Sequence, residues 1–125
     1  MAHCDESLRK IFGAIRAYAK ANGGGYPARL EELVEAEAIT AWDLVCSAGS
    51  VPIGKSSYVY RGSDLYETVP EEMVVAYDIG PWHKGRRNIL FVNGEVKRPP
   101  ERQFDRAISK DNQIRSEIGL EEKGF

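Results

Sequence analysis

Residues 88–98 read Asn-Ile-Leu-Phe-Val-Asn-Gly-Glu-Val-Lys-Arg and contain the clearest structural signal of the sequence. Two strand-like runs flank the pair Asn93-Gly94. An Asn-Gly pair between such runs is the strongest short-range signal of a β-hairpin, because both central residues of a type I′ turn need a positive φ. The stretch therefore predicts two antiparallel strands joined by a tight turn.

The residues on either side extend this hairpin to a sheet. Residues 57–60 and 73–77 are short runs of β-branched and aromatic residues, and each is followed by a glycine that closes it. The predicted antiparallel sheet therefore has four strands, over residues 57–60, 73–77, 88–92 and 95–98. Downstream, a helix is expected over residues 101–109, and a frayed tail follows because apolar residues then become sparse.

The N-terminal part of the chain predicts helices. Apolar residues recur at three- and four-residue steps over residues 5–21, and Asn22 with three glycines ends the pattern. A short helix is expected over residues 27–36. A loop follows over residues 39–54, and three of its apolar residues are expected to be buried: Trp42, Leu44 and Val45.

Helices followed by consecutive strands predict an α+β fold, in which an N-terminal amphipathic helix packs on a small antiparallel β-sheet with the helices on one face. The length of 125 residues suits a single domain, 1–125. Its expected parts are a stem helix (1–22), a short helix and loop (23–55), the sheet (56–98) and a C-terminal helix or tail (99–125).

Composition argues against several function classes. A net charge of −2 provides no basic field for a nucleic-acid backbone, so no nucleic-acid partner is expected. No run approaches the ~20 apolar residues that cross a bilayer, and the N-terminus lacks the regions of a signal peptide. No metal or other cofactor is expected, because there is no Cys-x-x-Cys motif and the acidic residues of 31–37 occupy the polar side of a helix.

Cys4 and Cys46 are the only cysteines. Two interpretations stay open: two free buried thiols, or one disulfide that ties the stem helix to the loop after the second helix. The disulfide requires an oxidising compartment and would stabilise the domain by about 2–4 kcal/mol.

His83 is the strongest candidate for a catalytic or metal-binding residue. It follows Asp78 by five positions and lies in a Gly-Pro-Trp-His-Lys-Gly loop. A general base or metal ligand needs a partner within hydrogen-bond reach, and Asp78 could be that partner. No second histidine or cysteine has a compelling position. We therefore expect His83 to bond a backbone carbonyl and fix the turn, and the chain not to be an enzyme.

Two motifs carry a resemblance to a known family. Tyr18 is followed by Asn22-Gly23 and then by Tyr26-Pro27. This order resembles the end of the amphipathic half-helix of pilins and type II secretion pseudopilins, and the short helix that follows is similar too.

The second motif lies near the other end, where His83 is followed by nine residues and then Asn93-Gly94. This spacing is similar to the prepilin-like family marked by histidine, nine residues and Asp-Gly, with Gly-Arg-Asn-Val-Leu-Phe inside the interval. Asn93 replaces the family's aspartate, and Glu95 stands where a histidine often follows. The resemblance covers about four-fifths of the chain.

The resemblance implies a structural or assembly subunit, a pseudopilin or prepilin-like protein of an envelope filament or type II secretion-like system. It implies a head exported from the bacterial inner membrane, partners among other pilin-like subunits or secretion-system components, and structural roles for the motif residues. An apolar helix of ~20 residues and a cleaved leader would lie upstream. We expect the chain to be a truncated form of such a protein rather than a divergent soluble relative.

The length of the first helix, compared with the width of the sheet, predicts which of its residues face other subunits (the assembly face). A helix of ~17 residues is about 25 Å long, whereas four strands span only about 15–20 Å. Leu8, Ile11 and Phe12 are therefore expected to lie partly uncovered, where an anchor or neighbouring subunits would pack. Two other functions remain open: a free module that binds a peptide or anion through the Trp42 and Trp82 region or the Arg86-Arg87 loop, and an enzyme centred on His83.

Overall fold

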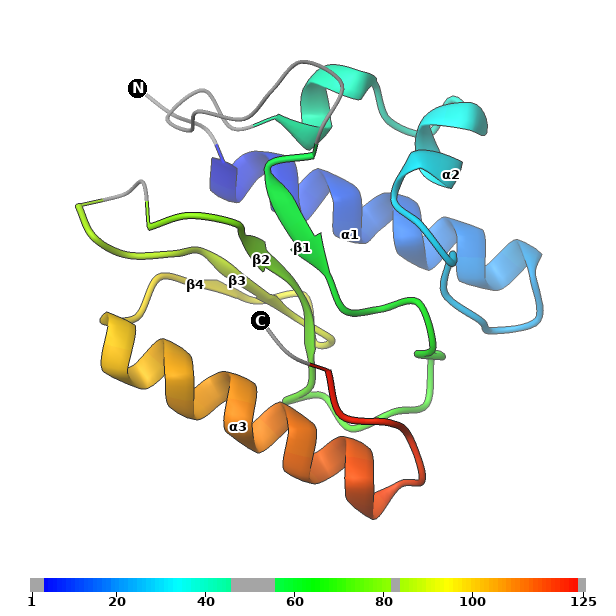
Figure 1. Cartoon of the computed structure of the whole chain (residues 1–125). Coiled ribbons are helices and arrows are strands. Elements are labelled where there is room, and N and C mark those ends of the chain that lie inside the picture. Colours follow the sequence, from blue (N-terminus) through cyan, green and yellow to red (C-terminus); the bar gives the residue numbers. More distant parts are fainter. Residues whose placement is uncertain (1–3, 46–55, 82–83, 124–125) are drawn as a thin grey trace.

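The protein is a β-sheet with one long helix on each face. The computed structural model describes residues 4–45, 56–81 and 84–123. Helices α1 (Cys4–Ala21) and α3 (Glu101–Glu117) lie on opposite sides of the sheet (Figure 1). The predicted α+β class, with an N-terminal helix packed on an antiparallel sheet, is confirmed. Within the described ranges, none of the helices combines the length and apolar character that a bilayer-spanning helix needs.

The sheet contains four strands in sequence order, and every neighbouring pair is antiparallel. The strands are β1 (Tyr58–Tyr60), β2 (Val74–Asp78), β3 (Ile89–Phe91) and β4 (Val96–Lys97). All four predicted strands are present, and most are shorter than the corresponding runs of sequence. Because β2 is central and buried along its whole length, its residues separate the two cores of the molecule.

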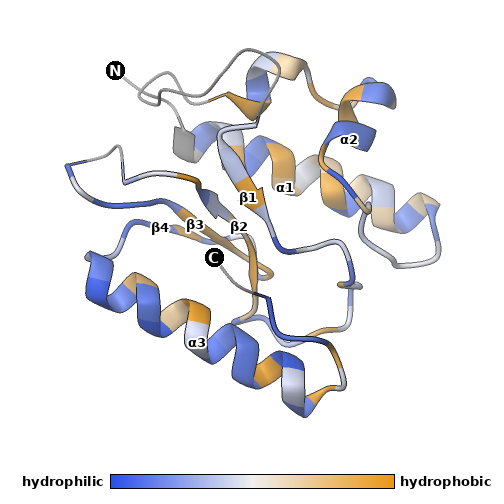
Figure 2. Cartoon of the chain, viewed as in Figure 1, coloured by the Kyte–Doolittle hydropathy of each residue, from blue (hydrophilic) through white to orange (hydrophobic). Residues whose placement is uncertain are grey.

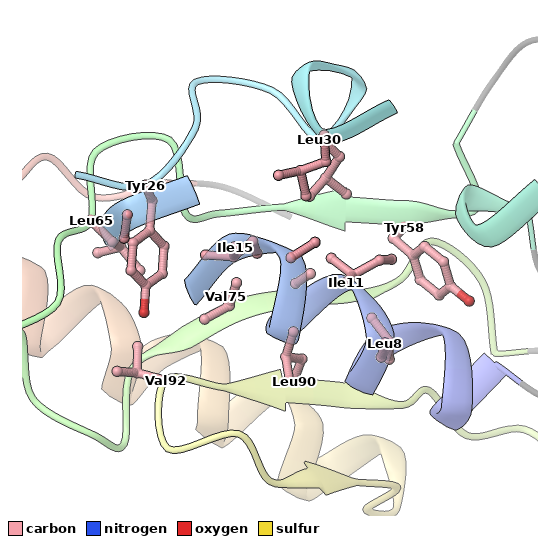
Figure 3. Close-up of a cluster of buried hydrophobic side chains, with 14 of the residues drawn as sticks. Leu8, Ile11, Ile15, Tyr26, Leu30, Tyr58, Leu65, Val75, Leu90 and Val92 are labelled. Atoms are coloured by element: carbon pink, nitrogen blue, oxygen red, sulfur yellow. The ribbon is translucent and has the colours of Figure 1, made fainter. Parts of the chain in front are cut away.

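The first core lies between α1 and the sheet. Figure 3 shows Leu8, Ile11 and Ile15 of α1 directed at Val75 of β2 and Leu90 of β3, and all five side chains are fully buried. Burial of one such side chain contributes about 1.5–3 kcal/mol. The apolar stripe that predicted the helix is therefore also the main contact that holds it on the sheet.

The expectation that the start of α1 lies partly uncovered is wrong for Leu8 and Ile11, which are 0% exposed. That expectation compared the length of the helix only with the width of the four strands. In the structure α2 (Glu31–Glu35) and the 3-10 helix η1 (Ala41–Leu44) also pack on α1 and cover the rest of its apolar stripe. Phe12 is half-buried at the margin of this core.

The C-terminal helix corrects two expectations. It continues to Glu117 instead of ending near residue 109, and it covers the face opposite α1, whereas the helices were expected on one face. The tail is not frayed at Lys123, whose backbone N–H donates to Asn112 Oδ1 at 2.9 Å. Most of α3 is hydrophilic (Figure 2). The predicted end near residue 109 was therefore too early, because that prediction relied on apolar residues. The residues of this second core are Val74, Tyr77, Ile89, Phe104 and Ile108.

The segment before the sheet is less buried than expected. Leu44 is buried as predicted, but Trp42 is 82% exposed and Val45 is 39% exposed. In a helix of three residues per turn, positions two apart face different directions. Leu44 packs into the first core, so Trp42 projects into solvent. The short helix is also shorter than its predicted range of 27–36.

Candidate functional site

The Asn93-Gly94 hairpin is the part of the resemblance that the structure describes best. Gly94 has φ +88° and its N–H donates to Phe91 O at 2.9 Å, while Glu95 N–H donates to Asn93 Oδ1 at 2.9 Å. Asn93 does not have a positive φ, so the predicted type I′ turn is wrong. The connection is the longer kind, in which a turn is followed by one left-handed glycine.

Gly94 is also the point at which the hairpin meets α1. A Cβ atom built on Gly94 would lie 2.9 Å from Cε2 of the Phe12 ring. Real Cβ contacts are not that short, so the ring occupies the space that a side chain at 94 would need. The stem helix and the hairpin motif, 82 positions apart in numbering, are therefore in direct contact.

The Tyr26-Pro27 motif connects the end of α1 to the sheet. Asn22 Nδ2 donates to the Tyr18 carbonyl at 2.8 Å, which caps the helix. Tyr26 N–H then donates to Leu65 O at 3.0 Å, and Tyr60 Oη donates to Pro27 O at 2.7 Å. These contacts join the motif residues to the rest of the fold.

Both tyrosines of this junction stay protonated at neutral pH. Burial raises the pKa of Tyr26, an effect that Arg16 opposes and Glu67 reinforces. Burial also raises the pKa of Tyr60, so its hydroxyl keeps the proton that it donates to the Pro27 carbonyl. The junction therefore holds no tyrosine poised for acid–base chemistry near pH 7.

A buried ionic cluster on the α3 side was not found from the sequence. Asp111 Oδ2 accepts from Arg61 Nε at 2.9 Å and from Arg115 Nε at 3.1 Å, and its Oδ1 accepts the Val74 N–H at 2.7 Å. Arg115 also pairs with Asp64 at 2.8 Å. Arg61, Asp111 and Arg115 are at most 1% exposed, so substrates have no access to them. The cluster fastens α3 to the sheet.

A groove opens on the same face, between α3 and the β1 side of the sheet, with a volume of about 490 Å³. Its floor contains Tyr77 and Phe104, whose rings meet edge-to-face with centroids 5.0 Å apart. The Arg87 guanidinium lies 4.8 Å from the centre of the Phe104 ring and is paired with Glu101. The seven lining residues are Val59, Tyr77, Ile79, Arg87, Glu101, Phe104 and Asp105.

The described lining of the groove combines apolar and charged side chains. Burial raises the pKa of Tyr77, while Arg61 and Arg87 act in the opposite direction. Among the residues that the structure describes, those lining the groove include carboxylates, a guanidinium and a phenol, and no serine, cysteine or histidine. An apolar floor with a few charged groups at the side is typical of a recognition site.

Several residues singled out in the sequence lie outside the described ranges: Cys46, Trp82 and His83. The Cys4–Cys46 disulfide, the role of His83 and the enzyme alternative therefore stay predictions. Asp78, suggested as the partner of His83, is buried, and its Oδ2 accepts the Asn88 N–H at 2.8 Å. Across residues 4–45, 56–81 and 84–123, no three acidic, histidine or cysteine residues converge on a position that could hold a metal ion.

Comparison of the chain with protein-family models, with curated proteins and with solved structures gives no match.

Proposed function

We propose that this protein is the head domain of a pilin-like assembly subunit, a pseudopilin or prepilin-like component of an envelope filament or type II secretion-like system. The observation that carries the proposal is the contact between Phe12 and Gly94. The two stretches that resemble the family, the stem helix and the hairpin, are remote in sequence and pack directly on each other. A shared architecture of stem and head accounts for both motifs at once.

The way α1 is held suits a stem. Its apolar side is buried over most of its length, so the helix and the sheet move as one body. A membrane helix joined to α1 would then fix the orientation of the whole head. On this proposal an apolar segment encoded upstream anchors the protein in the inner membrane and the head is exported.

The contact surface between subunits differs from the one expected at first. Leu8 and Ile11 are fully enclosed within the head and cannot meet a neighbour. The exposed side of α1 is basic instead. Its exposed cationic residues are Arg9, Lys10, Arg16 and Lys20. Neighbouring subunits would therefore meet the stem through polar and charged contacts.

The groove on the α3 face favours a second candidate function, a free binding module. Its aromatic floor and charged side would suit a peptide or a small ligand. A binding module needs no membrane anchor and no other subunits. The location of the complete gene product therefore separates the two functions.

The test is to express the complete gene, including its upstream codons, and to fractionate the cells. The assembly proposal predicts that the protein sediments with the inner membrane and that protease added to spheroplasts degrades the head. The 125-residue chain, expressed alone, is the matched control and should stay in the soluble fraction. A complete protein that is soluble inside the cell would overturn the proposal and favour the binding module.

A further inference from the structure

We propose that four residues beside the C-terminal half of α3 form a binding site for an extended peptide segment that carries a lysine. The site residues are Arg61, Ser63, Asp64 and Asn112, and residues 121–123 of the same chain, the strap, fill this site. In Figure 1 the strap (red) follows the end of α3 and lies beside the connection between β1 and β2. The site is at the end of α3 away from the groove, and the inference does not depend on the assembly function.

Asn112 recognises the backbone of the strap. Its Oδ1 accepts the Lys123 N–H at 2.9 Å, and its Nδ2 donates to the Lys123 carbonyl, also at 2.9 Å. The same pair of bonds, to the N–H and the C=O of one residue, joins opposite residues in an antiparallel ladder. Arg61 Nη1 donates to that carbonyl as well, at 3.0 Å. Main-chain contacts of this kind give affinity for an extended peptide, whatever its side chains.

The lysine side chain of the strap is recognised separately. Lys123 Nζ donates to Ser63 Oγ at 2.7 Å and lies 3.7 Å from Asp64 Oδ1. Only 29% of the side chain is exposed, although lysine is among the residues that are usually most exposed. A hydroxyl and a carboxylate at these distances favour an ammonium group over a neutral side chain. The site therefore selects a lysine in addition to binding the backbone.

The site is held in shape by bonds that do not involve the strap. Arg61 Nη2 donates to Asn112 Oδ1 at 2.6 Å, which fixes the end of the amide that faces the strap N–H. Arg61 Nε donates to Asp111 at 2.9 Å, and Asp64 is paired with Arg115 at 2.8 Å. Release of the strap would leave these bonds intact, and a preformed site binds a peptide at a lower entropic cost.

The strap can leave the site without disturbing either core. The apolar contacts that precede it are made by Ile118 and Leu120, which pack at the margin of the first core. The strap residues before Lys123 are exposed, and the Glu121 carbonyl accepts from Arg115 Nη1 at 3.4 Å. A segment with few buried apolar contacts opens locally at a fraction of the free energy of unfolding. The strap is therefore an internal competitor for the site, and a peptide of the same chemistry displaces it.

The experiment opens the strap and adds a peptide. Lys123→Pro in the 125-residue chain removes the ammonium group and the N–H that Asn112 binds, and leaves the site residues unchanged. A peptide with the sequence of residues 119–123, Gly-Leu-Glu-Glu-Lys with blocked ends, is titrated into the nitrogen-15-labelled chain and followed by NMR spectroscopy. We expect saturable shifts of the Asn112 side-chain amide and of the backbone amides of Ser63 and Asp64. The wild-type chain should bind the peptide at least about tenfold more weakly, because its own strap closes the site.

Matched variants test the proposed contacts in the Lys123→Pro background. Asn112→Ala should abolish binding, and Ser63→Ala, at an exposed position, should weaken it, whereas Gln113→Ala, at the neighbouring exposed amide, should leave it unchanged. A peptide with norleucine in place of the lysine keeps the carbon chain without the ammonium group, and should bind at least about fivefold more weakly. In the wild-type chain, saturating peptide should shift the Lys123 backbone amide, because the strap then leaves Asn112.

Four results would each overturn the inference: no saturable binding by Lys123→Pro, equal binding by the wild type, binding that Asn112→Ala and Ser63→Ala leave intact, or equal binding of the norleucine peptide. A Lys123→Pro chain that does not fold would overturn it as well, because the strap would then be required for the fold. These assays do not depend on where the complete protein is located, so the failure of this inference and the failure of the assembly proposal are visible separately.

Discussion

Gly94 illustrates how one residue can be required for two reasons at once. Its φ of +88° lies in the left-handed region, and the Phe12 ring occupies the space where a Cβ would lie. The sequence predicted the first requirement through the Asn-Gly pair. The second depends on which residue of a distant helix lies over the hairpin, and no local pattern carries that information.

Gly94→Ala should therefore destabilise the protein more than a substitution that only strains the backbone. Gly119 is the matched control, since its φ is +86° and a Cβ there would meet nothing within 4 Å. Both variants should lose about 1–3 kcal/mol from backbone strain, and Gly94→Ala should lose about 1 kcal/mol more from overpacking against Phe12. Urea denaturation measures both losses.

The same pair of variants in a Phe12→Ala background completes the comparison. Removal of the ring should abolish the excess cost of Gly94→Ala and leave the cost of Gly119→Ala unchanged. An excess that persists without the ring would show that Phe12 and Gly94 do not interact as described.

Asp111 is the residue on which the α3 face depends. Asp111→Ala would leave Arg61 and Arg115 buried without the carboxylate that they share. Removal of one partner from such a buried cluster costs about 3–5 kcal/mol. Asp105→Ala, on the exposed side of the same helix, should change the free energy of unfolding by no more than about 0.5 kcal/mol. Similar effects of the two variants in chemical denaturation would refute the structural role of the cluster.

Among the elements, α1 and the strands were predictable because they bury apolar stripes with a clear period. Leu8, Ile11 and Ile15 recur on one side of a helix, and the strands are short runs of residues that favour sheets. α3 was underestimated for the opposite reason. Its second half buries two charged residues, Asp111 and Arg115. They pair with each other and with the distant residues Arg61 and Asp64, which makes their burial possible.

The groove could not be predicted either. It forms where Tyr77 and Ile79 from β2 and its following loop meet Phe104 and Asp105 from α3. The sequence placed the C-terminal helix on the same face as the first, so these residues were not expected to meet. Trp42 was expected to be buried because it is apolar. It is exposed because η1 turns Leu44 toward the core and therefore Trp42 toward solvent.

The turn η1 has a measurable dependence on pH. Burial raises the pKa of Asp43, but hydrogen bonds from Thr40 and Lys10 outweigh this effect and hold the pKa below its ordinary value of 3.8. A carboxyl whose pKa is depressed by folding stabilises the folded state above its unfolded pKa, and this contribution is lost as pH falls through the folded pKa.

We therefore expect Asp43→Asn to be less stable than the wild type at pH 7, by up to about 1 kcal/mol for a partly exposed cap. The difference should shrink as the pH falls below the ordinary value of 3.8, and it should vanish below the lowered pKa of folded Asp43, where the wild-type carboxyl is protonated too. Urea denaturation at a series of pH values measures it. A difference that is constant from pH 7 to acid would show that the Asp43 charge does not stabilise the cap.

For the whole molecule, the two helices on opposite faces leave distinct surfaces for distinct contacts. The exposed side of α1 is basic, η1 presents Trp42, and the groove opens beside α3. In the proposed subunit the stem would set the orientation of the head, and the basic side of α1 would meet its neighbours.

The most direct test of the assembly proposal is photo-crosslinking in the envelope of cells that express the complete gene, with benzoylphenylalanine at Arg16 on the exposed side of α1. The same replacement at Glu122, in the exposed C-terminal tail, is the control for random collision. We expect position 16 to give discrete crosslinks to another copy or to a second pilin-like protein, and position 122 to give none. A complete protein that crosslinks to nothing from position 16 would contradict the assembly function.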